Sequence, residues 1–232
     1  MNSKILKEIE SHKNLEKGKF LSGFFKTGRG EYGEGDVFWG LTAPTSRSIA
    51  LKHKDATLSD INLLLKNKVH EVRLVGVLML VHKYKIGTEE EKEKIVNFYL
   101  KNTKYINNWD LVDLSSHYIL GDYLSNKKDR NILLKLARSK NLWEQRISII
   151  STFAFIKRGE LRLTFEITKI FLSHKHDLMH KAVGWMLREV GKKDEKALRK
   201  FLDTNKHRMP RTMLRYAIER FPENTRLKYL RK

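Results

Sequence analysis

The short segment NNWDLVD, residues 107–113, places an aromatic ring and a carboxylate where they could act together. Trp109 and Asp113 are four positions apart, so on a helix their side chains project from one face. An indole face attracts cations, and a carboxylate stabilises positive charge. The pair therefore suits stabilisation of a cation, and the guanidinium of Arg146, at an equivalent repeat position, would add a phosphate contact beside it. The simpler alternative is a core tryptophan beside a solvated aspartate.

A second tryptophan occurs in KAVGWMLRE, residues 181–189. Gly184 precedes Trp185 and, having no side chain, allows a backbone or a ligand to approach closely. Trp185 is thus a candidate ligand contact. The alternative is a tryptophan buried between two helices.

Metal and thiol chemistry have little support in the sequence. His176 and His180 stand at helical spacing beside His174, but Asp177 is the one carboxylate nearby and lysines surround the site. The chain has no cysteine, which excludes disulfides, thiolate nucleophiles and cysteine-type zinc sites. We expect no metal and no cofactor.

The glycine run Gly28-Arg29-Gly30-Glu31-Tyr32-Gly33 has the spacing G-x-G-x-x-G of nucleotide-binding loops. A dinucleotide fingerprint needs a strand before the glycines and a helix that begins at the last one. The preceding residues do not read as a strand, and the acidic residues in and after the run would repel a pyrophosphate. The run is therefore predicted to be a turn-rich loop in which glycines adopt positive φ angles.

The elements that carry these residues are predicted to be helices. Only three prolines interrupt the chain, and apolar residues in VRLVGVLMLVHKY, residues 72–84, recur at helical spacing. Strand alternation is absent over any useful length. No linker or low-complexity tract divides the sequence, so we expect an all-α fold in a single domain, 1–232.

Internal similarity indicates a repeat architecture. DLMHKAVGWMLREVG, from Asp177, aligns without gaps on RMPRTMLRYAIERFP, from Arg208, and basic or aromatic anchors recur at intervals of about 36 residues. This period is typical of an α-solenoid of HEAT-like helical repeats, which curves around a concave face. The anchors would then form a basic row along the groove that could bind a phosphate backbone: Arg73, Trp109, Arg146 and Lys181.

Charge favours a polyanionic partner. The chain has 47 Lys and Arg against 27 Asp and Glu, a formal net charge of +20, which is more than solubility requires. The sequence has no apolar run long enough to span a membrane, and its N-terminus lacks the apolar stretch of a signal peptide. The charge leaves DNA, RNA and an acidic membrane surface as candidate partners. We expect a cytoplasmic monomer, nucleoid-associated if the partner is DNA.

Four motifs, in this order and spacing, make the chain resemble the DNA alkylation repair glycosylases of AlkD type, which are built from HEAT-like repeats. They are EGDVFWGLTAPTSR, NNWDLVDL, LWEQR and KAVGWMLREVG. The resemblance covers nearly the whole chain. The segment from Gly40 to Pro44 corresponds to a family turn that approaches DNA, but its polar residues vary and receive no chemical role.

The resemblance implies a DNA glycosylase that hydrolyses the N-glycosidic bond of N3- and N7-alkylated purines in double-stranded DNA, without a base-flipping pocket. It implies that Asp113 is the catalytic carboxylate. It also implies that Trp109 and Trp185 lie beside the damaged nucleotide and that Arg146 contacts a nearby phosphate. From their repeat positions, Arg73 and Lys181 are predicted to contact phosphates as well.

Two other functions fit part of the sequence. A non-catalytic DNA-binding paralogue would keep the basic groove, although backbone binding alone gives no reason to retain Asp113 opposite DNA. A protein-binding scaffold is a common function of helical repeats. The net charge of +20 argues against the scaffold.

Overall fold

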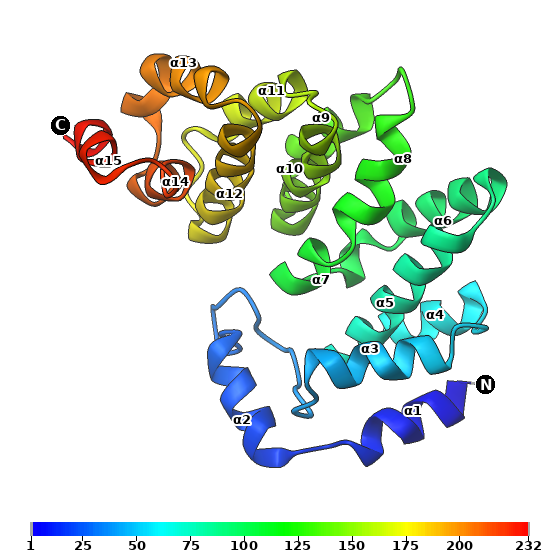
Figure 1. The fold of residues 1–232 in the computed structure, drawn as a ribbon. Helices are drawn as coiled ribbons and strands as arrows, with labels where there is room; N and C mark the ends of the chain where they lie inside the picture. The colour runs from blue at the N-terminus through cyan, green and yellow to red at the C-terminus, as the bar shows by residue number, and fades with distance from the viewer. Residues whose placement is uncertain (1, 232) are drawn as a thin grey trace. The chain divides into compact units, whose positions relative to one another are not determined.

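The computed structural model describes residues 2–231, and within this range the chain is all-helical, without any β-strand. Two compact units divide the chain, unit 1 ending at Ile119 and unit 2 beginning at Leu120. Most helices follow one another with short connections, and a long loop joins α2, which ends at Phe24, to α3, which begins at Ala43 (Figure 1). This confirms the predicted all-α fold of stacked helices, an α-solenoid, whereas the basic groove stays a prediction.

Unit 1 is built around a long buried helix, α5 (His70–Ile86), which packs against four of its neighbours in the unit, α1, α3, α4 and α6, and contacts α7. The other helical elements of this unit are α1 (Asn2–Ser11), α2 (Leu15–Phe24), α3 (Ala43–Lys52), α4 (Leu58–Leu65), α6 (Glu89–Lys101), η1 (Thr103–Tyr105) and α7 (Trp109–Asp113). A π-helical turn, η2 (His117–Gly121), leads into unit 2.

Unit 2 is organised by two long helices, α10 (Leu142–Lys157) and α12 (Asp177–Lys193), which pack against each other. The others are α8 (Asp122–Ser125), α9 (Asn131–Ala137), α11 (Arg162–Phe171), α13 (Glu195–Asn205), η3 (Lys206–Arg208), α14 (Arg211–Ala217) and α15 (Glu223–Leu230). The two segments that align in the sequence correspond to α12 and α14, which pack side by side.

The three prolines all stand at helix starts, where a missing N–H costs nothing. Pro44 lies in the first turn of α3, and Pro210 and Pro222 are the N-cap residues of α14 and α15. Thr57 and Thr88 begin α4 and α6 with capping boxes, in which the threonine hydroxyl and an acidic side chain three residues later each bond the other's backbone. Local sequence therefore fixes where these helices begin.

The glycine run lies in the loop between α2 and α3, as predicted. Within the run Gly30 adopts a positive φ of 78°, whereas Gly28 and Gly33 do not, so the expected positive φ is confirmed at one of its three glycines. Gly35 and Gly40, later in the same loop, adopt φ angles of 86°, a region that suits glycine. An isolated parallel bridge between Val37 and Val69 joins the end of this loop to the start of α5. The loop is thus a connecting segment attached to α5.

Among residues 2–231, none of the helices is both long enough and apolar enough to cross a membrane.

Candidate functional site

Trp109 and Asp113 are the first and last residues of α7, one helical turn apart. The Asn108 side chain accepts a hydrogen bond from the Trp109 backbone N–H at 2.8 Å and so fixes the start of this helix. Both predicted site residues are half-buried. Burial raises the pKa of the Tyr99 hydroxyl, and the negative charge of nearby Asp113 adds a smaller contribution in the same direction. The predicted pair therefore shares one short helix.

A stack of four rings leads from the interior of unit 1 to Trp109. The ring centroids of His70 and Phe38 are 4.5 Å apart, those of Phe38 and Phe25 are 4.8 Å apart, and those of Phe25 and Trp109 are 5.2 Å apart. Interplanar angles of 22°, 21° and 14° make the rings nearly parallel. This ring column sets the plane of the Trp109 indole.

A buried charge network surrounds the inner end of the column. His70 bridges two carboxylates, with Nδ1 3.1 Å from Asp36 and Nε2 2.8 Å from Asp110. Arg73 donates to the other oxygen of Asp36 at 2.6 Å, and the Asn108 amide also donates to Asp36 at 3.1 Å. Because Asp110 and Asn108 belong to the first turn and cap of α7, the network connects the glycine loop, α5 and α7.

The buried network stabilises the charged forms of His70 and Asp36. Burial by itself would lower the pKa of His70, but the carboxylates of Asp110 and Asp36 outweigh it and raise this pKa to about 9. Burial opposes the charge of Asp36, yet the hydrogen bond from His70 and the charge of Arg73 hold its pKa below the usual value. Two cations and two carboxylates therefore compensate one another beneath Trp109.

Arg73 has protein partners inside unit 1. Its side chain is 4% exposed, and besides Asp36 it donates to the backbone carbonyls of Asn67 and Lys68 at 3.1 and 3.2 Å. Its position in the repeat predicted an anchor along the groove, whereas the structure gives this guanidinium an internal role in attaching the loop to α5. Its contact with DNA phosphate stays a prediction.

Glu71 also attaches the glycine loop to α5. Its carboxylate accepts backbone N–H bonds from Trp39, Gly40 and Leu41 at 3.0, 2.7 and 3.2 Å. A Cβ atom on Gly40 would lie 2.1 Å from the Asn14 carbonyl oxygen, so this position requires glycine for space as well as for φ. The motif EGDVFWG, which carried the family resemblance, thus forms the contacts that hold the loop in place.

In unit 2, Arg146 lies near the start of α10 and is 4% exposed. It donates a 2.6 Å hydrogen bond to the backbone carbonyl of Leu178, in the first turn of α12. The predicted phosphate ligand therefore also connects two helices of its own unit.

Trp185, on α12, is half-buried and lies 6.0 Å from the ring of Phe153. Its indole N–H donates to Glu189 at 3.1 Å, and Glu189 also binds the ammonium of Lys192 at 2.7 Å. A Cβ atom on Gly184 would lie 2.6 Å from the Met213 carbonyl oxygen, so the close approach expected at this glycine is made by the backbone of α14.

Lys181 stands one turn before Trp185 on α12 and is 42% exposed as a side chain. Its ammonium is 2.7 Å from Asp177, an i,i+4 pair on the helix surface. In the neighbouring histidine cluster, His174 bonds the Gln145 side chain and His180 bonds the His174 carbonyl. Within residues 2–231, no group of three or more potential ligands could hold a metal ion.

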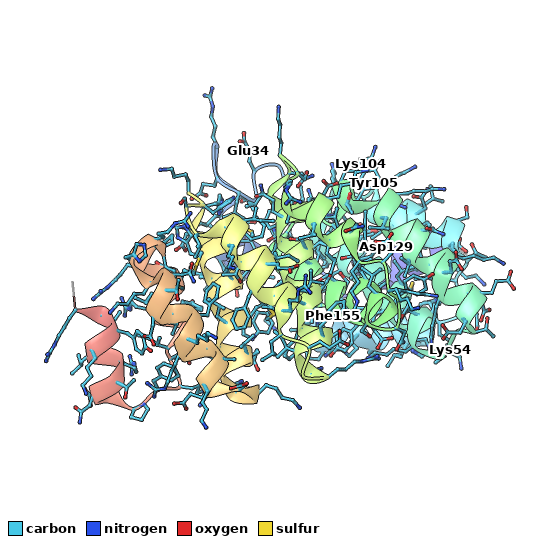
Figure 2. The ribbon with its side chains drawn as sticks, turned by 90° about the horizontal axis from the view of Figure 1, so that it is seen from above. Glu34, Lys54, Lys104, Tyr105, Asp129 and Phe155 are labelled. Carbon is cyan, nitrogen blue, oxygen red and sulfur yellow. The ribbon has the colours of Figure 1, made fainter. Side chains whose placement is uncertain are left out.

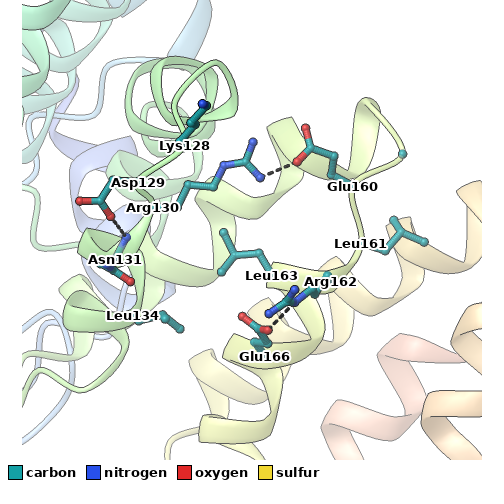
Figure 3. A pocket seen from close by; sticks show the side chains of 11 residues that line it. Lys128, Asp129, Arg130, Asn131, Leu134, Glu160, Leu161, Arg162, Leu163 and Glu166 are labelled. Atoms are coloured by element: carbon teal, nitrogen blue, oxygen red, sulfur yellow. Dashed lines mark hydrogen bonds and ion pairs between the residues drawn. The ribbon is translucent and has the colours of Figure 1, made fainter.

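An open pocket of about 850 Å³ in unit 2 contains none of the predicted site residues. Figure 3 shows charged side chains of both signs facing it, with Arg130 paired to Glu160 and Arg162 paired to Glu166. Since these charges compensate one another and no aromatic ring lines the pocket, it lacks the features that would bind a cationic base.

Basic side chains project into solvent from many helices (Figure 2). Lys104, labelled there beside Tyr105, places its ammonium 4.9 Å from the centre of the tyrosine ring. Basic groups next to aromatic faces occur repeatedly, as with Lys85 at Tyr118 and Lys157 at Phe153. Such a surface suits an anionic partner.

Comparison with known proteins agrees with these features. Residues 5–221 match the family model described as "DNA alkylation repair enzyme". The fold is similar to that of a solved structure described as "Predicted DNA alkylation repair enzyme from Enterococcus faecalis", with a TM-score of 0.70 and 15% sequence identity over 91% of this chain and 98% of that one. No curated protein sequence matches the chain. The match over residues 5–221 shows that the chain belongs to the DNA alkylation repair enzyme family.

Proposed function

We propose that this repair protein is a DNA glycosylase that hydrolyses the N-glycosidic bond of cationic N3- and N7-alkylated purines, such as 3-methyladenine and 7-methylguanine, in duplex DNA. It would act as a monomer and single domain at the start of base excision repair, without a base-flipping pocket. Membership of the DNA alkylation repair enzyme family supports the DNA substrate and the repair role.

The observation that carries the proposal is the pair formed by Trp109 and Asp113 on α7. The ring column fixes the indole at one end of this helix, and the carboxylate lies one turn away at the other end. A site built to stabilise a cation needs an aromatic face and a negative charge held in fixed positions. Both side chains are half-buried, which keeps them accessible while limiting their freedom.

The chemistry needs only one carboxylate. An N7- or N3-alkylated purine already carries a positive charge and leaves as a neutral base, so the general acid of ordinary glycoside hydrolysis is dispensable. As the bond breaks, positive charge develops on the deoxyribose, and Asp113 would stabilise it and position water. At about 4 Å and an effective dielectric near 20, such a pair is worth roughly 4 kcal/mol, about a thousandfold in rate.

In unit 2 we propose Trp185 as a second aromatic contact with the lesion or its sugar, and Lys181, the more exposed cation, as a phosphate contact. Arg146 and Arg73 are the other proposed phosphate contacts. Each would have to share its guanidinium between DNA and its present partners, the Leu178 carbonyl for Arg146 and Asp36 for Arg73.

The test is release of 7-methylguanine from methylated duplex DNA by the wild type and by Asp113→Asn. We expect the variant to lose nearly all release while binding undamaged duplex as tightly as the wild type, since the amide keeps the shape of the side chain but not its charge. Wild-type release by Asp113→Asn would overturn the catalytic assignment. Loss of duplex binding would show that Asp113 has a structural role instead.

A further inference from the structure

Helix α2 carries two phenylalanines on its exposed surface. Phe20 is 71% exposed and Phe24 is 55% exposed, and their rings are nearly parallel, with centroids 6.4 Å apart and an interplanar angle of 14°. Exposing large aromatic rings side by side costs solvation free energy and marks interaction surfaces. We call Phe20 and Phe24 the α2 aromatic face.

The α2 aromatic face continues into the candidate site of unit 1. The Phe24 ring meets the Trp109 indole edge-on, with centroids 6.1 Å apart and an interplanar angle of 67°. Phe24 also contacts Phe25, which belongs to the ring column, and their ring centroids are 5.1 Å apart. An uninterrupted row of rings therefore runs from Phe20 through Phe24 to Trp109.

The residues around this face are strongly basic. Exposed cations stand before, within and after α2, and the one acidic residue in the same stretch is Glu16. The cations are Lys13, Lys17, Lys19, Lys26 and Arg29. Aromatic rings interleaved with cations are the combination that binds unpaired nucleic acid, because the rings stack on bases while the cations contact the backbone.

We propose that the α2 aromatic face stacks unpaired nucleobases of DNA. Bases within an intact duplex are already stacked on their neighbours, so the face selects single-stranded or locally opened DNA over fully paired DNA. This inference extends the DNA binding of the proposed function. It involves no bond cleavage, so binding to unmethylated DNA tests it separately from the glycosylase activity.

The experiment measures, by fluorescence anisotropy, the affinity of the full chain for one labelled unmethylated oligonucleotide, first alone and then annealed to its complement. We expect Phe20→Ala and Phe24→Ala each to weaken single-strand binding about 5- to 100-fold, the range for loss of one base–aromatic stack. Affinity for the paired duplex should change less than about twofold.

Matched controls separate stacking from general apolar contact. Leu51→Ala and Leu63→Ala remove exposed apolar side chains of unit 1 that are 49% and 54% exposed but lie outside the row of rings, and both should bind like the wild type. Phe20→Tyr keeps a ring and should retain single-strand affinity, whereas Phe20→Leu keeps apolar area and should lose it.

Three results would overturn the proposal. The first is unchanged single-strand affinity in Phe20→Ala and Phe24→Ala. The second is an equal loss of affinity for single strand and duplex. The third is sedimentation showing that the wild type self-associates and that Phe20→Ala abolishes this, which would assign the face to a second copy of the chain.

Discussion

The two candidate tryptophans have similar sequence settings and different surroundings. Trp109 and Trp185 are each followed four residues later by an acid, Asp113 and Glu189 respectively. In unit 2 the acid accepts the indole N–H and binds the ammonium of Lys192. In unit 1 the indole is held by a stack of rings, and the nearby cations bind Asp36 and Asp110.

The two surroundings assign different roles to Asp113 and Glu189. Glu189 orients its own tryptophan and is compensated by a cation, so little of its charge is available to a substrate. Around Trp109 the ring column orients the indole, so Asp113 is not needed for that task. We therefore expect Asp113 to act on substrate and Glu189 to act on Trp185.

The largest expected effect is on base release. Asp113→Asn should slow release about a thousandfold. Glu189→Gln, whose amide oxygen can still accept the indole N–H, should slow it less than about fivefold, since it loses one ion pair with the exposed Lys192. Single-turnover release of 7-methylguanine measures both, and comparable losses would remove the distinction between the two acids.

The second effect is on stability against pH and comes from His70. The pKa of His70 in the folded chain, about 9, lies above its ordinary value of 6.5. The contribution of His70 to the free energy of unfolding is therefore complete below pH 6.5 and is lost as the pH rises through 9. The shift corresponds to about 3 kcal/mol. Urea unfolding of unit 1 from pH 6 to 10, followed by fluorescence in a variant with Trp143 and Trp185 replaced by Phe, should show this decline.

The stability of unit 2 should depend on pH in the opposite direction, decreasing as the pH falls. Burial, with smaller contributions from His176 and His180, lowers the pKa of His174, so protonation of His174 destabilises unit 2 as the pH falls below 6.5. In His70→Gln the alkaline decline of unit 1 should disappear while the acid response of unit 2 persists. An alkaline decline of the same size in His70→Gln would assign the titration to another group.

The third effect concerns two glycines that sequence patterns singled out, one in each unit. Gly40→Ala combines a φ of 86° with a backbone clash and should destabilise unit 1 by about 2–4 kcal/mol. In Gly184→Ala the new Cβ atom would lie 2.5 Å from the Tyr216 Cβ, but the backbone φ is an ordinary one. We therefore expect this variant to destabilise unit 2 by about 1–3 kcal/mol. Gly30→Ala, with open space around it, provides the control for φ alone.

The smallest effect is on salt dependence. If Lys181 contacts one phosphate, Lys181→Ala should reduce the slope of log affinity against log salt by about 1 without changing stability. Arg146→Ala should flatten the slope and weaken binding to all duplexes, but it should also destabilise unit 2 because the Leu178 carbonyl loses its donor. An unchanged slope in either variant would remove that residue from the phosphate contacts.

Helical elements and local turns could be predicted because they depend on short-range features. The apolar periodicity of α5, the turn-forming role of the glycine run and the close approach at Gly184 all follow from neighbouring residues. Trp109 and Asp113 lie on one helix, where their spacing of four residues predicted a shared face. Their roles with substrate stay predictions.

The buried charge network could not be predicted, because it joins residues that are far apart in the sequence. Asp36, His70 and Asp110 lie in a loop and two helices, and nothing in their local sequence indicates that one imidazole bridges both carboxylates. For the same reason the burial of Arg73 was missed, since its partner Asp36 belongs to the glycine loop. The one signal in the sequence is Asp36 itself, an acidic residue in the motif EGDVFWG.

The decisive measurement for glycosylase activity is the identification, by mass spectrometry, of the free bases released when the wild type and Asp113→Asn are incubated with methylated duplex DNA. We expect the wild type to release 3-methyladenine and 7-methylguanine and to leave abasic sites in the DNA, and the variant to release almost none. Binding of the methylated duplex by the wild type with no base released would contradict this activity.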